Sequence, residues 1–276
     1  MSKKTILNTA LFCDYPWSLQ FIKNIIKFKN FNIILVITSK KKSSTIIEEN
    51  KKYLNNNNII VLVTNSKKKI LSTLKFHKIS IGISIAYSLI FNKSLISFFN
   101  NCLFNIHPSY LPFRKGPDPI RHGIIENDKY FGVTLHLIDN KIDSGDIISQ
   151  FKMLNDKKSN VKKILDILGN KFFNNIINDL INYSLSYKRR IKQRLVKNNT
   201  YSYRLSQKEL LIDNFDTLVM AVNKNRASLP YKNVLYKYHN KKIMSNKLLS
   251  LTKKRNYLKY KLKNKIIYIS ILNEKK

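Results

Sequence analysis

Glycine and proline are scarce in this sequence, because each occurs only six times in 276 residues. Four glycines and four prolines nevertheless lie between Pro108 and Gly145. Both residues form backbone geometries that other residues avoid, so their concentration indicates tight turns and a close approach of the backbone to a ligand. We therefore expect the functional site within residues 104–150.

Cysteine and long apolar runs are also rare. The two cysteines, Cys13 and Cys102, lie far apart without a CxxC motif or a histidine cluster. We expect two buried, reduced thiols and no bound metal.

The best apolar run, residues 79–91, contains serines and is shorter than the roughly 20 residues of a membrane span. The N-terminus has no cleavage site. The sequence predicts a cytoplasmic protein without a membrane partner, and nothing in it indicates an obligate protein partner.

Acidic residues are few, with 16 Asp and Glu against 51 Lys and Arg, which gives a formal net charge of +35. A charge of this size is typical of proteins that bind nucleic acid or another polyanion. The chain is also crowded with Lys, Asn, Ile, Phe and Tyr, a bias that AT-rich coding produces without selection for binding. The charge attracts phosphates whatever its origin, so it permits an RNA partner without identifying one.

Short β-rich runs alternate with helix-like stretches in the first half of the chain. The pattern predicts strands over residues 5–12, 32–38, 59–64 and 79–86, separated by helices over 17–28, 46–54 and 68–76. Strands joined by helices of this length pair in parallel through right-handed crossovers. We therefore expect an α/β fold with an open, mostly parallel sheet that binds ligands outside the carboxyl ends of its strands.

The second half has a different pattern. A helical stretch over 161–187 precedes a basic run, KRRIKQRLVKNN, which is either a solvated linker or a phosphate contact. Beyond it we expect a polar helix at 213–223 and strands at 233–239 and 265–272. The predicted organisation is a catalytic domain over residues 1–187, a basic linker over 188–199 and a smaller β-rich C-terminal domain over 200–276.

Asn105, His107 and Asp143 form the strongest candidate for a catalytic group. Asn105 and His107 are two residues apart in an extended segment, so their side chains project from the same side. Pro108 restricts His107 to extended geometry. An IDSGD turn containing Asp143 follows. Such a set can orient a carbonyl, move a proton and stabilise an oxyanion without a metal. His77, His122, His136 and His239 lack comparable context, and we assign them to the surface or to packing.

The segments NIHPSYLPFRKG and FGVTLHLIDNKIDSGDIISQ resemble the core signature of the 10-formyltetrahydrofolate-dependent formyltransferases. This family includes methionyl-tRNA, glycinamide ribonucleotide and sugar N-formyltransferases, and the first is the most similar. The upstream SIAYSLIFNKSLI is similar to the family's strand and loop at the pterin pocket. The resemblance implies a Rossmann-like formyltransferase domain and the use of 10-formyltetrahydrofolate as formyl donor.

The resemblance also implies roles for individual residues. Asn105 would bind the formyl oxygen, His107 would stabilise the charge that develops there, and Asp143 would hold the protonation state of His107 and help to take a proton from the amine. The expected folate-binding residues are those of two segments: Ala86, Tyr87, Ser88, Leu89 and Ile90, and then Ser109, Tyr110, Leu111 and Pro112. Arg114 and Lys115 are candidates for contact with an acidic substrate or the folate glutamate tail.

The acceptor amine stays open between two main candidates. YSYRLSQKELLIDNFDT resembles the start of the second domain in the transfer-RNA enzymes, which favours initiator methionyl-tRNA. The FCDYPW turn, the short SKKKSS loop and the length of the C-terminal part argue against transfer RNA, and that length is closer to the length in the sugar enzymes, which act on a nucleotide-linked amino sugar. A non-catalytic RNA-binding protein is disfavoured because the Asn/His/Asp set is complete. A dehydrogenase is disfavoured because no GxGxxG follows the first strand.

Overall fold

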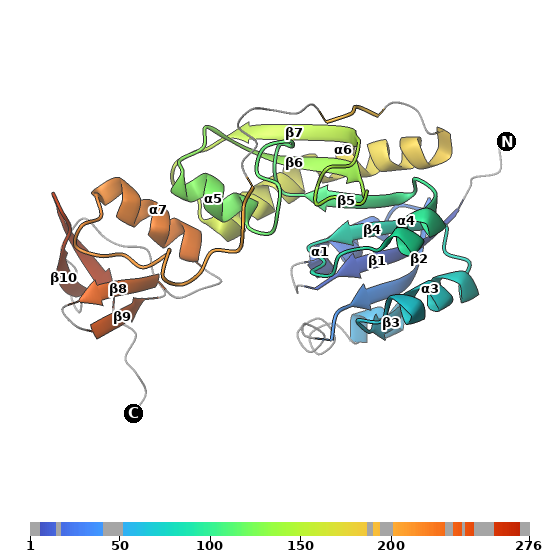
Figure 1. The fold of residues 1–276 in the computed structure, drawn as a ribbon, viewed down its shortest axis with the longest axis horizontal. Helices are drawn as coiled ribbons and strands as arrows, with labels where there is room; N and C mark the ends of the chain where they lie inside the picture. Colours follow the sequence, from blue (N-terminus) through green and yellow to red (C-terminus); the bar gives the residue numbers. More distant parts are fainter. Residues whose placement is uncertain are drawn as a thin grey trace. The chain divides into compact units, whose positions relative to one another are not determined.

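The computed structural model describes residues 6–14, 18–40, 52–186, 190–193, 201–229, 234–238, 241–245 and 257–270. A seven-stranded sheet with the order β3-β2-β1-β4-β5-β6-β7 is its main element (Figure 1). Its strands are β1 (Leu7–Cys13), β2 (Phe31–Thr38), β3 (Ile60–Val63), β4 (Ile81–Ile85), β5 (Leu103–His107), β6 (Tyr130–Leu137) and β7 (Ile147–Leu154).

The strands from β1 to β5 pair in parallel, which confirms the predicted open, mostly parallel sheet. β6 then runs antiparallel to β5. The chain adds β2 and β3 on one side of β1 before it crosses to β4 on the other side. The order of the sheet therefore reverses between β1 and β4, the point at which sheets of this kind bind ligands beyond the carboxyl ends of their strands.

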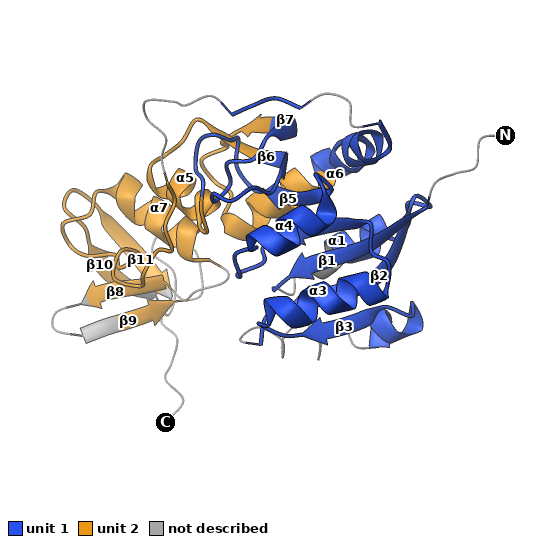
Figure 2. Ribbon diagram, turned by 45° about the vertical axis from the view of Figure 1, so that its right-hand side comes forward, with its two compact units in different colours: residues 1–115, 133–151, 171–199 blue, residues 116–132, 152–170, 200–276 orange. Residues whose placement is uncertain are grey.

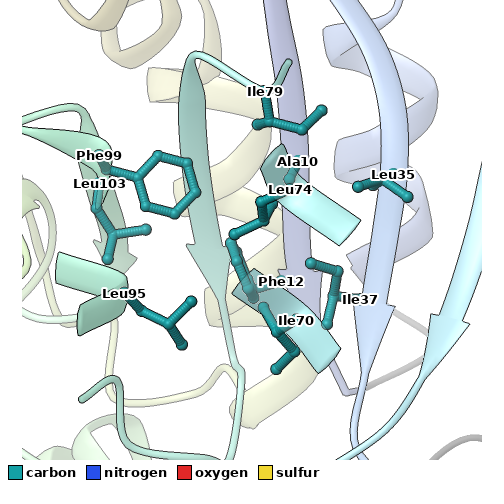
Figure 3. Close-up of a cluster of buried hydrophobic side chains, with 10 residues drawn as sticks. All are labelled: Ala10, Phe12, Leu35, Ile37, Ile70, Leu74, Ile79, Leu95, Phe99 and Leu103. Atoms are coloured by element: carbon teal, nitrogen blue, oxygen red, sulfur yellow. The ribbon is translucent and has the colours of Figure 1, made fainter. Parts of the chain in front are cut away.

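Both faces of the sheet are covered by helices. The helices are α1 (Ser18–Ile25), α3 (Lys67–Phe76), α4 (Lys93–Phe99), α5 (Pro119–Ile125), α6 (Val161–Ser186) and α7 (Leu218–Ser228). On one face, Phe12 of β1 lies among apolar side chains of α3 and α4, such as Ile70 and Leu95 (Figure 3). On the other face, α6 packs Tyr183 edge-on against Phe104 of β5, with 5.8 Å between the ring centroids.

The C-terminal part contains two antiparallel strand pairs, which confirms the predicted β-rich piece. β8 (Val234–Tyr238) pairs with β9 (Lys241–Ser245), and β10 (Tyr257–Lys261) pairs with β11 (Ile266–Ser270). Their buried side chains include Tyr236 and Tyr260, whose rings meet edge-on with centroids 5.4 Å apart. The Tyr260 hydroxyl donates a 2.6 Å hydrogen bond to the Lys237 carbonyl, which satisfies its polar end inside this core.

The predicted helix at 213–223 begins later in the structure, at Leu218. Thr217 is its N-cap, and its side chain accepts a hydrogen bond from the Met220 amide. The preceding residues form a turn, because the Asp216 carboxylate accepts bonds from the Asp213 amide and the Lys224 ammonium. An acidic residue bonds a local amide as readily in a turn as at a helix start. The sequence alone therefore did not distinguish a turn from a helix start at Asp213.

The chain forms two compact units (Figure 2). Unit 1 comprises residues 1–115, 133–151 and 171–199, and unit 2 comprises residues 116–132, 152–170 and 200–276. The domain limits at residues 187 and 200 stay a prediction, because compactness alone does not identify independently folding domains. Within the described part of the chain, no helix combines the length and the apolar character needed to cross a membrane.

The packing of Phe12 leads to a stability prediction. Phe12 is fully buried, and its ring lies 5.4 Å from that of Tyr87 and 4.9 Å from that of Phe91. Phe12→Ala removes these contacts and leaves a cavity, so we expect the free energy of unfolding to fall by about 3–5 kcal/mol. Urea denaturation measures this loss. Phe76→Ala is the matched control, because Phe76 is 81% exposed, and a shift of similar size there would contradict the assignment.

Candidate catalytic site

The site is built where β5 and β6 run antiparallel. The register places Asn105 opposite His136 and His107 opposite Thr134. Directly opposite residues in an antiparallel pair lie close together on the same face. The polar side chains that leave β5 at positions 105 and 107 therefore meet polar side chains of β6.

A tight turn between β6 and β7 brings Asp143 to the same place. Asp143 has a left-handed backbone, with φ of 48°. Gly145 lies so close to the end of β6 that an added Cβ would be 1.9 Å from the Leu137 carbonyl oxygen. Only glycine fits there, and this close approach holds the turn against the sheet. The IDSGD motif thus places a carboxylate beside the end of β5.

The three predicted catalytic residues meet in one cluster. The Asn105 amide nitrogen Nδ2 donates to Asp143 Oδ1 at 3.2 Å. His107 Nδ1 lies 3.5 Å from the other carboxylate oxygen, Oδ2. The side chains of His107 and Asp143 are 6% and 12% exposed, so their interactions are screened little by water.

His136 is a fourth member of the cluster that sequence reasoning missed. Its Nδ1 lies 2.8 Å from the Leu137 carbonyl oxygen, which can only accept, so Nδ1 carries the proton. In a neutral ring Nε2 then accepts, and it lies 3.1 Å from the Asn105 amide nitrogen. The alternation TLHL in β6 indicated a strand with His136 on one face. Only the antiparallel register with β5 identifies Asn105 as the partner of this histidine.

Burial keeps His136 neutral. Desolvation lowers the pKa of His136 to about 4, and the nearby His107 and Lys115 act in the same direction, whereas the Asp143 carboxylate and the Leu137 carbonyl oppose the shift. A neutral ring leaves Nε2 free to accept from Asn105, whereas a protonated ring would place two donors against each other. The lowered pKa therefore fixes the orientation of the Asn105 amide at neutral pH.

The contacts of His107 define where a proton is needed. Its Nε2 lies 2.9 Å from the Arg114 carbonyl oxygen and must donate to it. A neutral His107 therefore presents a lone pair on Nδ1 to the carboxylate of Asp143. Only a proton on Nδ1 or on Asp143 makes this contact a hydrogen bond. Without such a proton, the contact brings two acceptors together.

Two further residues hold the Asp143 turn. Gln193 Nε2 donates to the carbonyl oxygens of Asp143 at 3.0 Å and of Gly145 at 2.9 Å. Lys115 Nζ donates to the Ser144 hydroxyl at 3.3 Å. Burial lowers the pKa of Lys115, and the carboxylates of Asp143 and Asp139 oppose this shift. The cluster thus includes a partly buried ammonium group next to its carboxylate.

The expected folate-binding residues occupy two different environments. Ser109 and Leu111 are buried and bonded within the protein: the Leu111 amide donates to Thr134 Oγ1, and this hydroxyl donates to the Ser109 carbonyl. Tyr110 and Pro112 of the same loop are partly exposed. In the other segment, Ala86 has a left-handed backbone, with φ of 51°. Tyr87 and Leu89 are partly exposed there, and Ser88 and Ile90 are exposed.

Comparison with known sequences gives one family. Residues 18–171 match the family model described as formyl transferase. A methionyl-tRNA formyltransferase of Wolbachia pipientis subsp. Culex pipiens (strain wPip) is 37% identical over 91 residues, which cover 33% of this chain and 30% of that protein. The chain therefore spans less than a third of the length of the curated relatives it matches.

Solved structures match over more of the chain. A 4-N formyltransferase from Francisella tularensis has a TM-score of 0.67 and 25% identity, over 88% of this chain and 97% of that one. WlaRD, a sugar 3N-formyl transferase crystallised in the presence of dTDP and 5-N-formyl-THF, has a TM-score of 0.67 and 24% identity, over 99% and 100% of the two chains.

The neutral His136 leads to a prediction about pH. Its pKa is about 4 in the fold and 6.5 ordinarily, so between these values the unfolded chain binds a proton that the folded chain does not. The contribution of the neutral His136 to the free energy of unfolding is therefore fully present above pH 6.5, and it is lost as the pH falls from 6.5 toward 4. We expect this histidine to remove about 2 kcal/mol from the free energy of unfolding between pH 7.5 and pH 5.

Denaturation of the wild type and of His136→Gln at both pH values measures this contribution. The glutamine has no proton to gain in this range, so the variant should lose about 2 kcal/mol less than the wild type over the interval. An equal loss in both proteins would show that His136 is not held neutral.

Proposed function

This chain belongs to the formyl transferase family, and we propose that it transfers a formyl group from 10-formyltetrahydrofolate to a primary amine. The observation that carries the proposal is the meeting of Asn105, His107 and Asp143 around two buried contacts of 3.2 and 3.5 Å. In the reaction, a bond forms between the amine nitrogen and the formyl carbon while the bond from that carbon to the folate nitrogen breaks. One proton leaves the amine and one reaches the folate nitrogen.

Asn105 is the proposed donor to the formyl oxygen. Both protons of its amide point at protein acceptors, Nε2 of His136 and Oδ1 of Asp143. The bond to Asp143 is the one a formyl oxygen can replace, because the neutral His136 has no other donor within its described contacts. The oxygen gains negative charge when the amine attacks, and a donor fixed in a buried site stabilises that charge strongly.

His107 and Asp143 are the proposed proton-transfer pair. Their contact becomes a hydrogen bond only when a proton is present on one of them. Attack by an amine produces an ammonium group that must lose a proton, and a carboxylate backed by an imidazole can accept it. The proton would then be shared between Asp143 Oδ2 and His107 Nδ1, and the positive charge that His107 gains would lie near the developing oxyanion. Lys115, which donates to the neighbouring Ser144 hydroxyl, adds positive charge next to Asp143.

The proposed folate slot fits residues 86–90. The formyl donor supplies the activated formyl carbon, and the chain has to hold its pterin ring. The Tyr87 hydroxyl is buried and has no hydrogen-bond partner among the described residues. Burial and the nearby Asp14 raise its pKa, so it remains a neutral donor. A buried donor without a partner is costly unless a ligand satisfies it, and a pterin ring offers nitrogen and oxygen acceptors.

Initiator methionyl-tRNA is the acceptor we propose first. The curated relatives are methionyl-tRNA formyltransferases, matched over 25–34% of this chain. A nucleotide-linked amino sugar is the second candidate, because sugar N-formyltransferases match 97–99% of this chain in structure. The direct test is to incubate the protein with 10-formyltetrahydrofolate and each acceptor, and to identify which one becomes formylated. Formylation of neither would remove both proposed acceptors.

Substitutions of the cluster test the proposed chemistry. Asn105→Ala, His107→Ala and Asp143→Ala should each lower turnover by about two orders of magnitude or more, the size expected when an oxyanion or proton-transfer partner is lost. Single-turnover assays of the formylated acceptor measure this effect. Asp166→Ala is the matched control, since it removes an exposed carboxylate of α6 that pairs with Lys162. Near-normal turnover in two of the three folded variants would sink the catalytic assignment.

The salt dependence of acceptor binding separates the two acceptors. Transfer RNA contacts a protein through several phosphates, and each contact contributes about 0.7 decades of affinity per decade of salt, or somewhat more for duplex segments. A nucleotide-linked sugar offers only a diphosphate, so its slope should be shallow. Neutral replacements of two basic triplets should weaken the binding of transfer RNA and make its affinity less dependent on salt. These triplets are Lys40, Lys41 and Lys42, and Arg189, Arg190 and Arg194.

Lys40 and Arg190 lie in the described part of the chain, and the other four cations lie outside it. A triple variant of α6, in which Lys162, Lys163 and Lys171 become Gln, is the control because it loses the same charge. Unchanged affinity and slope in both test variants would mean that these segments are solvated faces.

A further inference from the structure

Asp14 is a buried carboxylate at the reversal point of the sheet. It directly follows β1, whose carboxyl end lies between those of β2 and β4 (Figure 1). Its side chain is fully buried. Neither the Asn105 cluster nor the proposed proton transfer uses it.

The two oxygens of Asp14 bind the two neighbouring strand ends separately. Oδ1 accepts from the Thr38 hydroxyl at 3.0 Å and from the Ser39 amide at 2.7 Å, both at the end of β2. Oδ2 accepts from the Ser88 amide at 2.7 Å and from the Ser88 hydroxyl, just beyond β4. A carboxylate with this many donors is held firmly, since hydrogen bonds to a charged acceptor are stronger than neutral ones.

Ser88 lies in the middle of the segment 86–90, and Asp14 is its polar anchor. The segment leaves β4 through the left-handed Ala86 and has an apolar anchor in Tyr87, whose ring packs on Phe12 with centroids 5.4 Å apart. Side chains of the segment are otherwise partly or fully exposed. The bond from the Ser88 amide to Asp14 fixes the backbone of this residue, whereas the 3.4 Å contact between the hydroxyls of Ser88 and Ser39 involves side chains only.

We propose that Asp14 is a positioning residue for the formyl donor, which it orders by fixing the backbone of residues 86–90 through Ser88. This inference rests on the proposed function, in which that segment holds the pterin ring. It has a second consequence for the acceptor. Backbone amides at this edge of an α/β sheet commonly bind a ligand phosphate. Here the amides of Ser39 and Ser88 bind Asp14 instead, so these two amides do not bind an acceptor phosphate.

Asp14→Asn tests the proposal, because it removes the negative charge from the bonds to Ser88 and leaves an acceptor for only one of the Ser39 and Ser88 amides. We expect the Kd of a non-hydrolysable 10-formyltetrahydrofolate analogue and the KM of the donor to rise about 10-fold to 100-fold, the loss typical for a charged hydrogen bond. Turnover at saturating donor should stay within about 3-fold of wild type. A purely structural role would instead lower the active fraction and leave the donor KM unchanged.

Thr9→Val is the control, since it removes a buried hydroxyl from the other end of β1 and should leave the donor KM unchanged. Hydrogen exchange at the Ser88 amide gives a readout independent of folate, and it should accelerate in Asp14→Asn. If Asp14→Asn does not fold, Ser88→Ala, which removes the hydroxyl bonds to Asp14 and Ser39 but keeps the amide bond to Asp14, should raise the donor Kd by about 3-fold to 10-fold.

A wild-type Kd and KM in folded Asp14→Asn, or in Ser88→Ala, would overturn the proposal. Failure of the wild type to bind the folate analogue is a separate outcome that overturns the proposed function itself. In that case unchanged exchange at Ser88 in Asp14→Asn would also overturn the anchoring role of Asp14.

Discussion

The Asn105 amide connects every part of the candidate site, because its two protons join two elements. One proton binds the neutral His136 on β6, and the other binds Asp143 in the turn after it. The first bond depends on the buried, neutral state of His136, and the second depends on the close approach of Gly145 to Leu137. In the proposed reaction the amide donates to the formyl oxygen, and these two constraints fix the direction in which its N–H groups point.

The sequence predicted the parts of this arrangement that depend on local geometry. Asn105 and His107 share a side of one strand, and the glycine in IDSGD indicated a tight turn that presents Asp143. His136 was missed because its role depends on an antiparallel register between β5 and β6, whereas the preceding strands all pair in parallel. A helix start was misplaced near Asp213 for a similar reason, since its turn is closed by Lys224 from further along the chain.

The net charge of +35 contributes less to the site than its size suggests. Near the cluster, Lys115 is bonded to Ser144, and Arg190 lies 3.4 Å from an oxygen of Asp146. These cations are matched to local oxygens and stabilise the turn that carries Asp143. The positive charge that exceeds such pairs attracts phosphates over long distances. This attraction is a property of the whole surface, and it can accelerate the encounter with an acceptor. Selection among acceptors requires contacts at defined positions.

Two carboxylates at the carboxyl end of the sheet have different surroundings and therefore different capacities. Asp14 is surrounded by hydroxyl and amide donors, each of which is satisfied by a carboxylate acceptor. Asp143 contacts the amide of Asn105 and the imidazoles of His107 and of the neutral His136, and it remains 12% exposed. The hydrogen bonds of Asp14 hold two neighbouring strand ends, whereas the contact of Asp143 with His107 needs a further proton to become a hydrogen bond. Anchoring a backbone and accepting a proton, the roles proposed for Asp14 and Asp143, need opposite environments, and the surroundings of the two carboxylates differ in this way.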